Sequence, residues 1–316
     1  MSTMKAITRE NFWFGILILL LIGLAGFPRY VSAYKVILLT NVLMYVIITL
    51  SWVIFSGSTG YISLAPAAFF GVGVYASALL SKSLFLPFFI VIGGLASFCL
   101  AFLVGALTLR LRGMYFTMFT FGLVELIRHF VQWWEVNITG TVGRLVLALD
   151  HLTIYYVIVI IFLLVLLTSY LIRRSKFGLA LQSIGECEEA AAHTGVNVTR
   201  VKVLTFAVSA FFIGVVGATM TMRWQYIDPP TAFDIRLSFM TVLMAIFGGM
   251  GHLYGPIIGA SIFSFLDEIL ATKFPYYYML LFGVTMFVVI LFMPHGVEGV
   301  IQKWHQRKKR GSSEKT

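Results

Sequence analysis

The sequence carries little charge for its length. Asp, Glu, Lys and Arg make up 11% of its 316 residues, whereas apolar residues make up 59%. A soluble domain carries about 25% charged residues, and a disordered chain is polar. A chain this poor in charge lacks the polar surface that would cover so much apolar material. The composition therefore excludes both an ordinary soluble domain and a disordered protein.

Cysteine is also scarce. Cys99 lies in an apolar run and Cys187 in a charged segment, and no other cysteine occurs. We expect no disulfide between them, which excludes a small disulfide-stabilised scaffold. The apolar stretches are continuous and do not alternate with polar residues as in a membrane β-barrel. These observations predict an all-α polytopic membrane protein.

Motifs of catalysis and nucleotide binding are missing as well. The six histidines show neither HExxH nor another metal-ligand spacing, and no GxxxxGK[ST] loop occurs. Gly71 and Gly73 are not followed by the rest of a dinucleotide-binding loop. We expect a protein that is no enzyme and holds no metal or cofactor. If ATP drives its action, ATP-Mg must be bound by other chains.

Apolar runs long enough for membrane helices recur along the chain, since a span needs about 20 apolar residues. The sequence predicts about ten transmembrane helices, some of them short or broken, at 11–27, 36–55, 61–80, 87–109, 115–130, 154–172, 203–222, 237–247, 255–270 and 277–292. The runs 237–247 and 255–270 are short for straight spans, and Gly248-Gly249-Met250-Gly251 lies between them. We expect broken or re-entrant helices there.

The net charge of +10 comes from basic residues that gather in alternate loops. With ten spans and both termini in the cytoplasm, most Lys and Arg residues fall on the cytoplasmic side, as in other membrane proteins. This distribution predicts a multi-pass membrane protein with both termini in the cytoplasm, and no role in nucleic-acid binding. We expect residues 1–302 to form one transmembrane domain, which includes the segment 173–202, and residues 303–316 to form a basic cytoplasmic tail.

The segment 173–202 is the longest polar excursion within the apolar sequence. Its centre, Glu186–Ala192, has helix-forming composition, and Gly195 is a plausible helix stop. One interpretation is a short surface helix that joins two spans. The other is a cytoplasmic helix that docks on a partner, since an isolated helix of this length is marginal in water.

This segment resembles a known family. Glu189-Ala190-Ala191, followed after three residues by Gly195, looks like the EAA loop of bacterial permeases of ATP-binding-cassette (ABC) importers, which docks on the ATP-binding subunit. The resemblance implies a coupling helix, and the residues that it assigns to coupling are Arg174, Glu188, Glu189, Ala190, Ala191 and Gly195.

Further motifs in matching order resemble the LivM-type permeases of branched-chain amino-acid ABC importers over about residues 36–300. They include a glycine-rich stretch from Gly57 to Tyr75, Leu109–Phe116 with Glu125 and Arg128 after it, Tyr226-Ile227-x-Pro229, Gly248–Ala260 and Phe292–Gly299. The chain departs from the pattern at Val53, Tyr61 and Ala65-Pro66. These are pathway-side positions, so the solute stays open.

The resemblance implies a complex of several subunits in the cytoplasmic (inner) membrane of a prokaryote. This chain would be the permease that moves Leu, Ile or Val. Its partners would be a second homologous permease subunit, two ATP-binding subunits, an extracytoplasmic solute-binding protein, the amino-acid substrate and the lipid bilayer. The same type of importer for urea or short amides is the first alternative. A stand-alone secondary transporter or channel, and a purely structural membrane subunit, are others.

Two groups of residues are candidates for the solute pathway or the membrane interior. Glycines that break helices, neutral hydroxyls and apolar rings would suit a weak pathway for a zwitterion, but small residues equally serve helix packing. The pathway candidates are Gly57, Ser58, Gly60, Ser63, Phe69, Phe70, Gly71, Gly73, Gly248, Gly249 and Gly251. Glu125 and Arg128, three residues apart, could form a membrane ion pair, which we expect at the outer end of the span 115–130.

Overall fold

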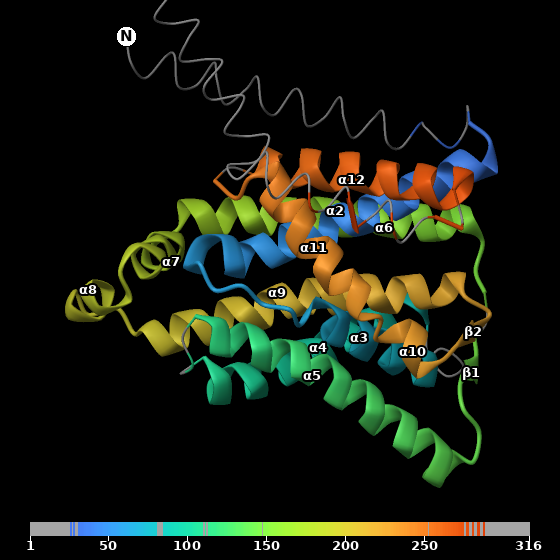
Figure 1. Cartoon of the computed structure of the whole chain (residues 1–316), viewed down its shortest axis with the longest axis horizontal. Coiled ribbons are helices and arrows are strands. Elements are labelled where there is room, and N and C mark those ends of the chain that lie inside the picture. Colours follow the sequence, from blue (N-terminus) through green and yellow to red (C-terminus); the bar gives the residue numbers. More distant parts are fainter. Residues whose placement is uncertain are drawn as a thin grey trace, which may run out of the picture.

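The computed structural model describes residues 31–80, 85–109, 111, 113–146, 148–251 and 253–274, together with residues 26, 28, 276, 277, 280, 283, 284 and 287. The expected spans 11–27 and 277–292 lie largely outside these residues, and the basic tail 303–316 lies wholly outside them. The described part is built of helices, with one two-stranded antiparallel sheet (Figure 1).

The elements follow the apolar runs of the sequence. The helices are α2 (Ala33–Thr59), α3 (Pro66–Leu80), α4 (Leu86–Thr108), α5 (Met114–Trp134), α6 (His151–Arg174), α7 (Lys176–Glu186), α8 (Glu188–His193), α9 (Val198–Met220), α10 (Pro229–Ala232), α11 (Ile235–Gly248) and α12 (Tyr254–Lys273). The π-helical turn η2 (Glu135–Thr139) follows α5, and the 3-10 turn η3 (Thr221–Arg223) follows α9. In the sheet, β1 (Arg144–Leu145) pairs with β2 (Tyr226–Ile227), with Arg144 opposite Ile227.

Six helical stretches in the described part are long and apolar enough to cross a membrane. They are Ala33–Thr59, Leu86–Thr108, His151–Arg174, Val198–Arg223, Pro229–Gly248 and Tyr254–Lys273, and α3 is a shorter apolar helix. The all-α polytopic fold is thereby confirmed, whereas the count of ten spans stays a prediction. Cys99 and Cys187 are both free, as expected.

The short runs expected at 237–247 and 255–270 correspond to α11 and α12, whose bounds differ from them by one to three residues. The first is lengthened at its start by α10, which Asp228 caps through a hydrogen bond from the Thr231 amide. The second, α12, has 20 residues and runs through Asp267 and Glu268. The Tyr34 hydroxyl donates to Glu268 Oε1 at 3.2 Å.

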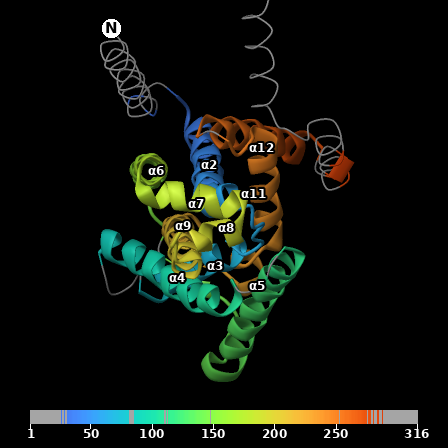
Figure 2. The same cartoon turned by 90° about the vertical axis from the view of Figure 1, so that its left-hand side faces the viewer.

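Small residues bring the central helices together. In Figure 2 helices α2, α3, α4 and α6 surround α9. A β-carbon at Gly73 on α3 would lie 2.1 Å from the carbonyl oxygen of Gly214 on α9, and one at Gly217 would lie 2.2 Å from the Phe70 oxygen. Only glycine permits backbones to approach so closely. The core of the chain is therefore a close-packed centre with α9 in its middle.

An extended segment, residues 61–65, leads from α2 into α3. Pro66 begins α3, a position where its missing amide hydrogen costs nothing. Side chains of three other helices satisfy the backbone of the segment and of the first turn of α3. Trp52 Nε1 donates to the Ser63 oxygen (2.8 Å), Thr120 Oγ1 accepts from the Leu64 amide (2.9 Å), and Ser238 Oγ accepts from the Ala67 amide (2.9 Å). Non-helical backbone inside a membrane protein needs partners of this kind.

The connections lie at the two ends of the bundle, as the alternating topology requires. One end gathers the end of α2, the end of α4, the α7–α8 segment and the turn between α11 and α12, on the left of Figure 1. The other end holds β1, β2 and the start of α6. Loops that the charge distribution assigned to one side of the membrane thus lie together. Which side faces the cytoplasm stays a prediction.

Candidate functional site: the α7–α8 segment and its buried ion pair

The polar segment 173–202 folds into two short helices that extend beyond the rest of the bundle (Figure 1). Ser175 ends α6 and caps α7, because its hydroxyl accepts a hydrogen bond from the Gly178 amide. Cys187 adopts an extended conformation between α7 and α8. The sequence suggested a helix here, and the structure divides it into two at this residue.

Gly195 ends α8 in the left-handed conformation, with φ of +86°. The Val196 amide donates to the Ala191 oxygen (3.3 Å), and the Gly195 amide donates to the Ala192 oxygen (3.1 Å). This pair of bonds is the Schellman arrangement, which favours glycine. Asn197 then caps α9 by accepting from the Arg200 amide. The predicted helix stop at Gly195 is confirmed.

Helix α7 is docked on the end of α2. Leu181 and Ile184 are buried, and a β-carbon at Gly185 would lie 2.3 Å from the Ser58 carbonyl oxygen. The last turn of α2 and the last turn of α7 are therefore in backbone contact. A displacement of α7 along this contact would reach α2 directly.

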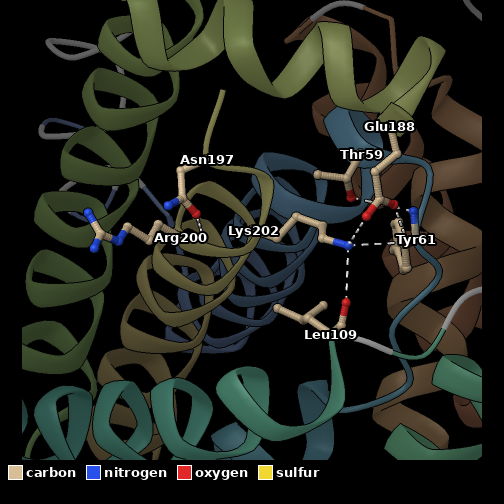
Figure 3. A network of polar contacts seen from close by, with 7 residues as sticks. All are labelled: Thr59, Tyr61, Leu109, Glu188, Asn197, Arg200 and Lys202. Atoms are coloured by element: carbon tan, nitrogen blue, oxygen red, sulfur yellow. Dashed lines mark hydrogen bonds and ion pairs between the residues drawn. The ribbon is translucent and has the colours of Figure 1, made fainter. Parts of the chain in front are cut away.

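Behind α8 lies a buried polar network centred on Lys202 of α9 (Figure 3). Its ammonium lies 2.9 Å from Glu188 Oε1, 3.1 Å from the Leu109 carbonyl oxygen and 3.2 Å from the Tyr61 hydroxyl. The Tyr61 hydroxyl donates to Glu188 Oε2 at 2.6 Å. Lys202 is 2% exposed and the Glu188 side chain 23%. The buried ammonium thus has a carboxylate directly beside it.

The network satisfies the ammonium fully, since an ammonium has three hydrogens and three acceptors lie within hydrogen-bond distance. One of them, the Leu109 oxygen, belongs to the residue that caps α4 and has no partner within that helix. The Lys202 ammonium also lies 4.5 Å from the centre of the Tyr61 ring. One side chain therefore ties α8, α9, the end of α4 and the segment after α2 to one another.

Arg173, the next-to-last residue of α6, makes a second tie at this end. Its guanidinium donates to the Gly251 oxygen (2.7 Å) and the Met250 oxygen (3.3 Å), in the turn between α11 and α12. Arg174 instead lies over the Tyr170 ring, with its guanidinium carbon 4.8 Å from the ring centre. Of the two arginines, Arg173 joins distant helices, although the sequence analysis had selected Arg174.

The other residues expected to couple to a partner lie on the surface. Glu189, Ala190 and Gly195 are exposed, whereas Ala191 is buried beneath them. Helix α8 thus has an outer face that is open in this chain and an inner face that is fixed by Glu188 and Ala191.

The residues expected along a pathway fall into two places. Gly57, Ser58, Gly60 and Ser63 lie where α2 ends, and Gly248, Gly249 and Gly251 lie in the turn that Arg173 contacts, so both groups adjoin the α7–α8 end. A β-carbon at Gly57 would lie 3.4 Å from that of Met250. Gly60 and Gly249 have φ of +74° and +91°, which explains glycine at both.

Phe69, Phe70, Gly71 and Gly73 lie in the core. The Phe69 ring packs on Phe206, with ring centres 5.2 Å apart, and the Phe70 ring packs on Trp224. A β-carbon at Gly71 would lie 2.2 Å from the Phe233 ring. In this conformation these residues pack helices together. Their role in a pathway stays a prediction.

Glu125 and Arg128 form the expected ion pair, with Oε1 3.2 Å from NH1. Their place relative to the membrane stays a prediction. Helix α5 runs on to Trp134 and continues into η2, so Glu125 lies near its middle.

Sequence reasoning missed Lys202, Tyr61 and Arg173 as site residues. Lys202 had counted only as a loop charge, and Tyr61 only as a departure from a family pattern. A signal was available for the lysine. It follows Gly195 and Asn197, which mark a helix stop and a helix cap, and it opens a long apolar helix. A lysine at the start of such an apolar helix indicates that an anion lies close to it in the fold.

The amino-acid sequence is similar to those of known permease proteins. The chain is 26% identical to the high-affinity branched-chain amino acid transport system permease protein LivM of Salmonella typhimurium and 27% identical to that of Escherichia coli, each over 89% of this chain and 74% of the relative. It is 28% identical to the ribose import permease protein RbsC of Haemophilus influenzae over 39% of this chain and 40% of that protein.

No solved structure matches the chain significantly. A protein family described as the permease component of the branched-chain amino acid transport system matches residues 35–290. This range contains both strands, the six apolar stretches except for the first residues of α2, and the α7–α8 segment. The chain is a multi-pass permease that belongs to this family.

Proposed function

We propose that the chain is the membrane-spanning subunit of an ABC importer for branched-chain amino acids. It would work in the cytoplasmic membrane of a prokaryote as one transmembrane domain with both termini inside. Its partners would be a second homologous permease, two ATP-binding subunits that carry ATP-Mg, and an extracytoplasmic solute-binding protein. This chain itself would catalyse no covalent step and hold no cofactor.

The observation that supports the proposal most directly is that α8 has one exposed face and one face fixed to the bundle. Glu189 and Ala190 on its outer face, and Gly195 just after it, are exposed, and its inner face is held by the Glu188–Lys202 pair. A partner that pulls on α8 therefore pulls on α9 and on the end of α4 as well. Closure of an ATPase pair would in this way change the packing of the membrane helices.

The experiment is ATP-dependent uptake by proteoliposomes that hold this chain with its co-purifying subunits and the binding protein. Glu189→Lys reverses a charge on the outer face of α8, and Gln182→Lys, also exposed but on α7, is the matched control. We expect Glu189→Lys to abolish leucine uptake and Gln182→Lys to leave it unchanged. Uptake that is driven by an ion gradient and indifferent to ATP would contradict the proposal.

A second candidate differs only in its solute. Permeases for ribose and xylose of Haemophilus influenzae match 39% and 40% of the chain, and importers of urea or short amides would need the same neutral core. The same proteoliposomes should therefore be offered leucine, ribose and urea. Uptake of ribose or urea without uptake of leucine would agree with the proposed mechanism and contradict the proposed solute.

A further inference from the structure

The chain between α5 and α6 lies at the end of the bundle opposite α8 (Figure 1). It begins with the π-helical turn η2, whose first residue is Glu135, and it forms β1 before α6 begins. Because β1 pairs with β2, this stretch is tied to the connector between α9 and α10. We refer to residues 135–146 as the strap.

The strap is anchored by Glu135, whose side chain is fully buried. Its Oε2 accepts a hydrogen bond from the Gly143 amide (2.8 Å), and its Oε1 lies 3.5 Å from Arg144 Nε. The Arg144 guanidinium in turn lies over the Trp134 ring, with its central carbon 5.1 Å from the ring centre. The first residue of the strap therefore holds the start of β1 in place.

Glu135 also connects the strap to the core. The buried Tyr75 hydroxyl on α3 lies close enough to the Glu135 carboxylate to interact with it electrostatically. The Tyr75 ring stacks on Phe233, with ring centres 5.6 Å apart, and Phe233 directly follows α10. A displacement of Glu135 would therefore change the contacts of both α3 and α10.

The hydrogen bonds of this cluster are incomplete. Among the described residues, the buried atoms Tyr75 Oη, Glu135 Oε1 and Arg144 Nε find no hydrogen-bond partner. Three such atoms from three elements are unusual in one place of a stable core. At the opposite end, the Lys202 ammonium has three acceptors within hydrogen-bond distance. The strap is thus held less firmly in this conformation than α8 is.

The connector that pairs with the strap resembles the connector beside α8. Residues 61–69 and 226–233 both begin with Tyr-Ile and end with Pro-x-Ala-Phe. The Tyr61 hydroxyl donates to Glu188 of α8 at 2.6 Å. The Tyr226 hydroxyl likewise donates to the Val142 oxygen of the strap at 2.9 Å. The strap and α8 therefore hold similar connectors at opposite ends of the bundle.

We propose that the strap is a lid that has to part from β2 during transport, and that Glu135 positions it in the closed state. The ribbon that has to open pairs two residues on each strand. Gly140 and Gly143, with φ of +72° and +81°, lie at the turns of the strap and permit backbone changes that other residues resist. A segment so briefly paired can open locally while the bundle stays folded. The inference rests on the proposed function only for the solute that its assay uses.

A reversible disulfide tests whether the strap has to move. Leu145 and Tyr226 lie opposite each other in the ribbon and are both exposed, and the β-carbons of such a pair are about 4.5–5.5 Å apart, close to what a disulfide spans. In a Cys99→Ser, Cys187→Ser background, Leu145→Cys and Tyr226→Cys are combined in the assembled complex in proteoliposomes. We expect oxidation to lower uptake at least about tenfold and a reductant to restore it, because a locked lid stops passage.

Each single cysteine variant, oxidised in the same way, is the control and should keep its uptake. Uptake that persists once the disulfide has formed would overturn the proposal, because a strap with a merely structural role can be locked without effect.

Labelling of a position beneath the strap tests the role of Glu135. Ile227 is fully buried and lies opposite Arg144. We expect a water-soluble thiol reagent to label Ile227→Cys at least about tenfold faster when Glu135→Gln is added. Asp150→Asn, which removes an exposed carboxylate near the same end, is the matched control and should leave the rate unchanged. Equal labelling with and without Glu135→Gln would overturn the role of Glu135, and so would equally fast labelling of Ala207→Cys in the core of α9, since the opening would then not be local.

The two tests separate the strap from the proposed solute. The disulfide lock is assayed with whichever solute the complex moves, ribose included, and the labelling contrast needs no solute. Failure of leucine uptake in the unlocked complex would therefore contradict the proposed function, whereas persistent uptake in the locked complex would contradict the strap as a lid.

Discussion

The ammonium of Lys202 on α9 lies 2.9 Å from the Glu188 carboxylate on α8, although the two residues are 14 positions apart and a glycine-ended turn separates them. The lysine is almost fully buried while the glutamate reaches the surface. The pair therefore connects an exposed helix to the core by one contact.

Replacement of Lys202 by Met should uncouple ATP hydrolysis from transport. The substitution leaves the Glu188 carboxylate and the Leu109 carbonyl oxygen without their cation. Removal of one partner of a buried pair costs about 3–5 kcal/mol, and the partial exposure of Glu188 places the cost at the lower end of this range. We expect uptake to fall at least about tenfold while ATPase activity of the assembled complex persists. Equal loss of both activities would contradict this.

A charge exchange, Glu188→Lys with Lys202→Glu, should fail to restore uptake. A glutamate at 202 has no hydrogen to donate to the Leu109 oxygen, which lies 3.1 Å from the lysine ammonium. Lys202→Arg keeps the donors and should retain part of the uptake. Full recovery in the exchanged protein, measured in the same proteoliposomes, would show that Leu109 plays no part in the network.

Tyr61→Phe removes one hydroxyl and leaves the ring in place. The hydroxyl donates to Glu188 Oε2 at 2.6 Å and lies 3.2 Å from the Lys202 ammonium. Hydrogen bonds to charged groups contribute about 1.5–3 kcal/mol. We expect a melting temperature lowered by a few degrees in detergent and a partial loss of uptake. Tyr115→Phe, at an exposed ring on α5, is the control and should change neither.

Gly73→Ala should destabilise the chain strongly, because the new methyl group would lie 2.1 Å from the Gly214 oxygen. Overpacking of a core costs about 1–3 kcal/mol. Gly122→Ala is the matched control in another helix, since nothing lies within 4 Å of its β-carbon position. Thermal unfolding should separate the two variants by several degrees. Similar melting temperatures would mean that α3 and α9 are less closely packed than described.

Gly195→Ala should loosen α8 without affecting the membrane helices. Glycine at φ of +86° avoids strain that other residues incur, about 1–3 kcal/mol. Hydrogen exchange should become faster at the amides of α8 and stay unchanged in α9. Protection of α8 that equals the parent protein would contradict a role for the Schellman turn.

Local patterns predicted much of this architecture. Continuous apolar runs located the helices of the described part, and Gly195 located the end of α8. The Glu125–Arg128 pair was evident because both residues belong to one helix. What the sequence could not provide was the network around Lys202, since Tyr61 and Leu109 lie 141 and 93 positions away and only packing of the helices brings them together.

The small residues show a second limit of prediction from the sequence. Gly71 and Gly73 would suit a pathway or a helix contact equally, because both uses require a short side chain. Only the positions of Phe233 and Gly214 decide between them in this conformation. For Glu125, the apolar run 115–130 ended before the helix does, so the sequence placed this residue nearer to the helix end than the structure does.

The extended segment 61–65 has a consequence for biogenesis. Its hydrogen-bond partners are Trp52, Thr120 and, for the start of α3, Ser238, which is synthesised 171 residues after Ala67. Until α11 has entered the membrane, the amide of Ala67 lacks that partner. Helix α3 therefore cannot reach its final packing before α11 has inserted, although it leaves the ribosome well before α11. A nascent chain that stalls before residue 238 should be a substrate for membrane quality control.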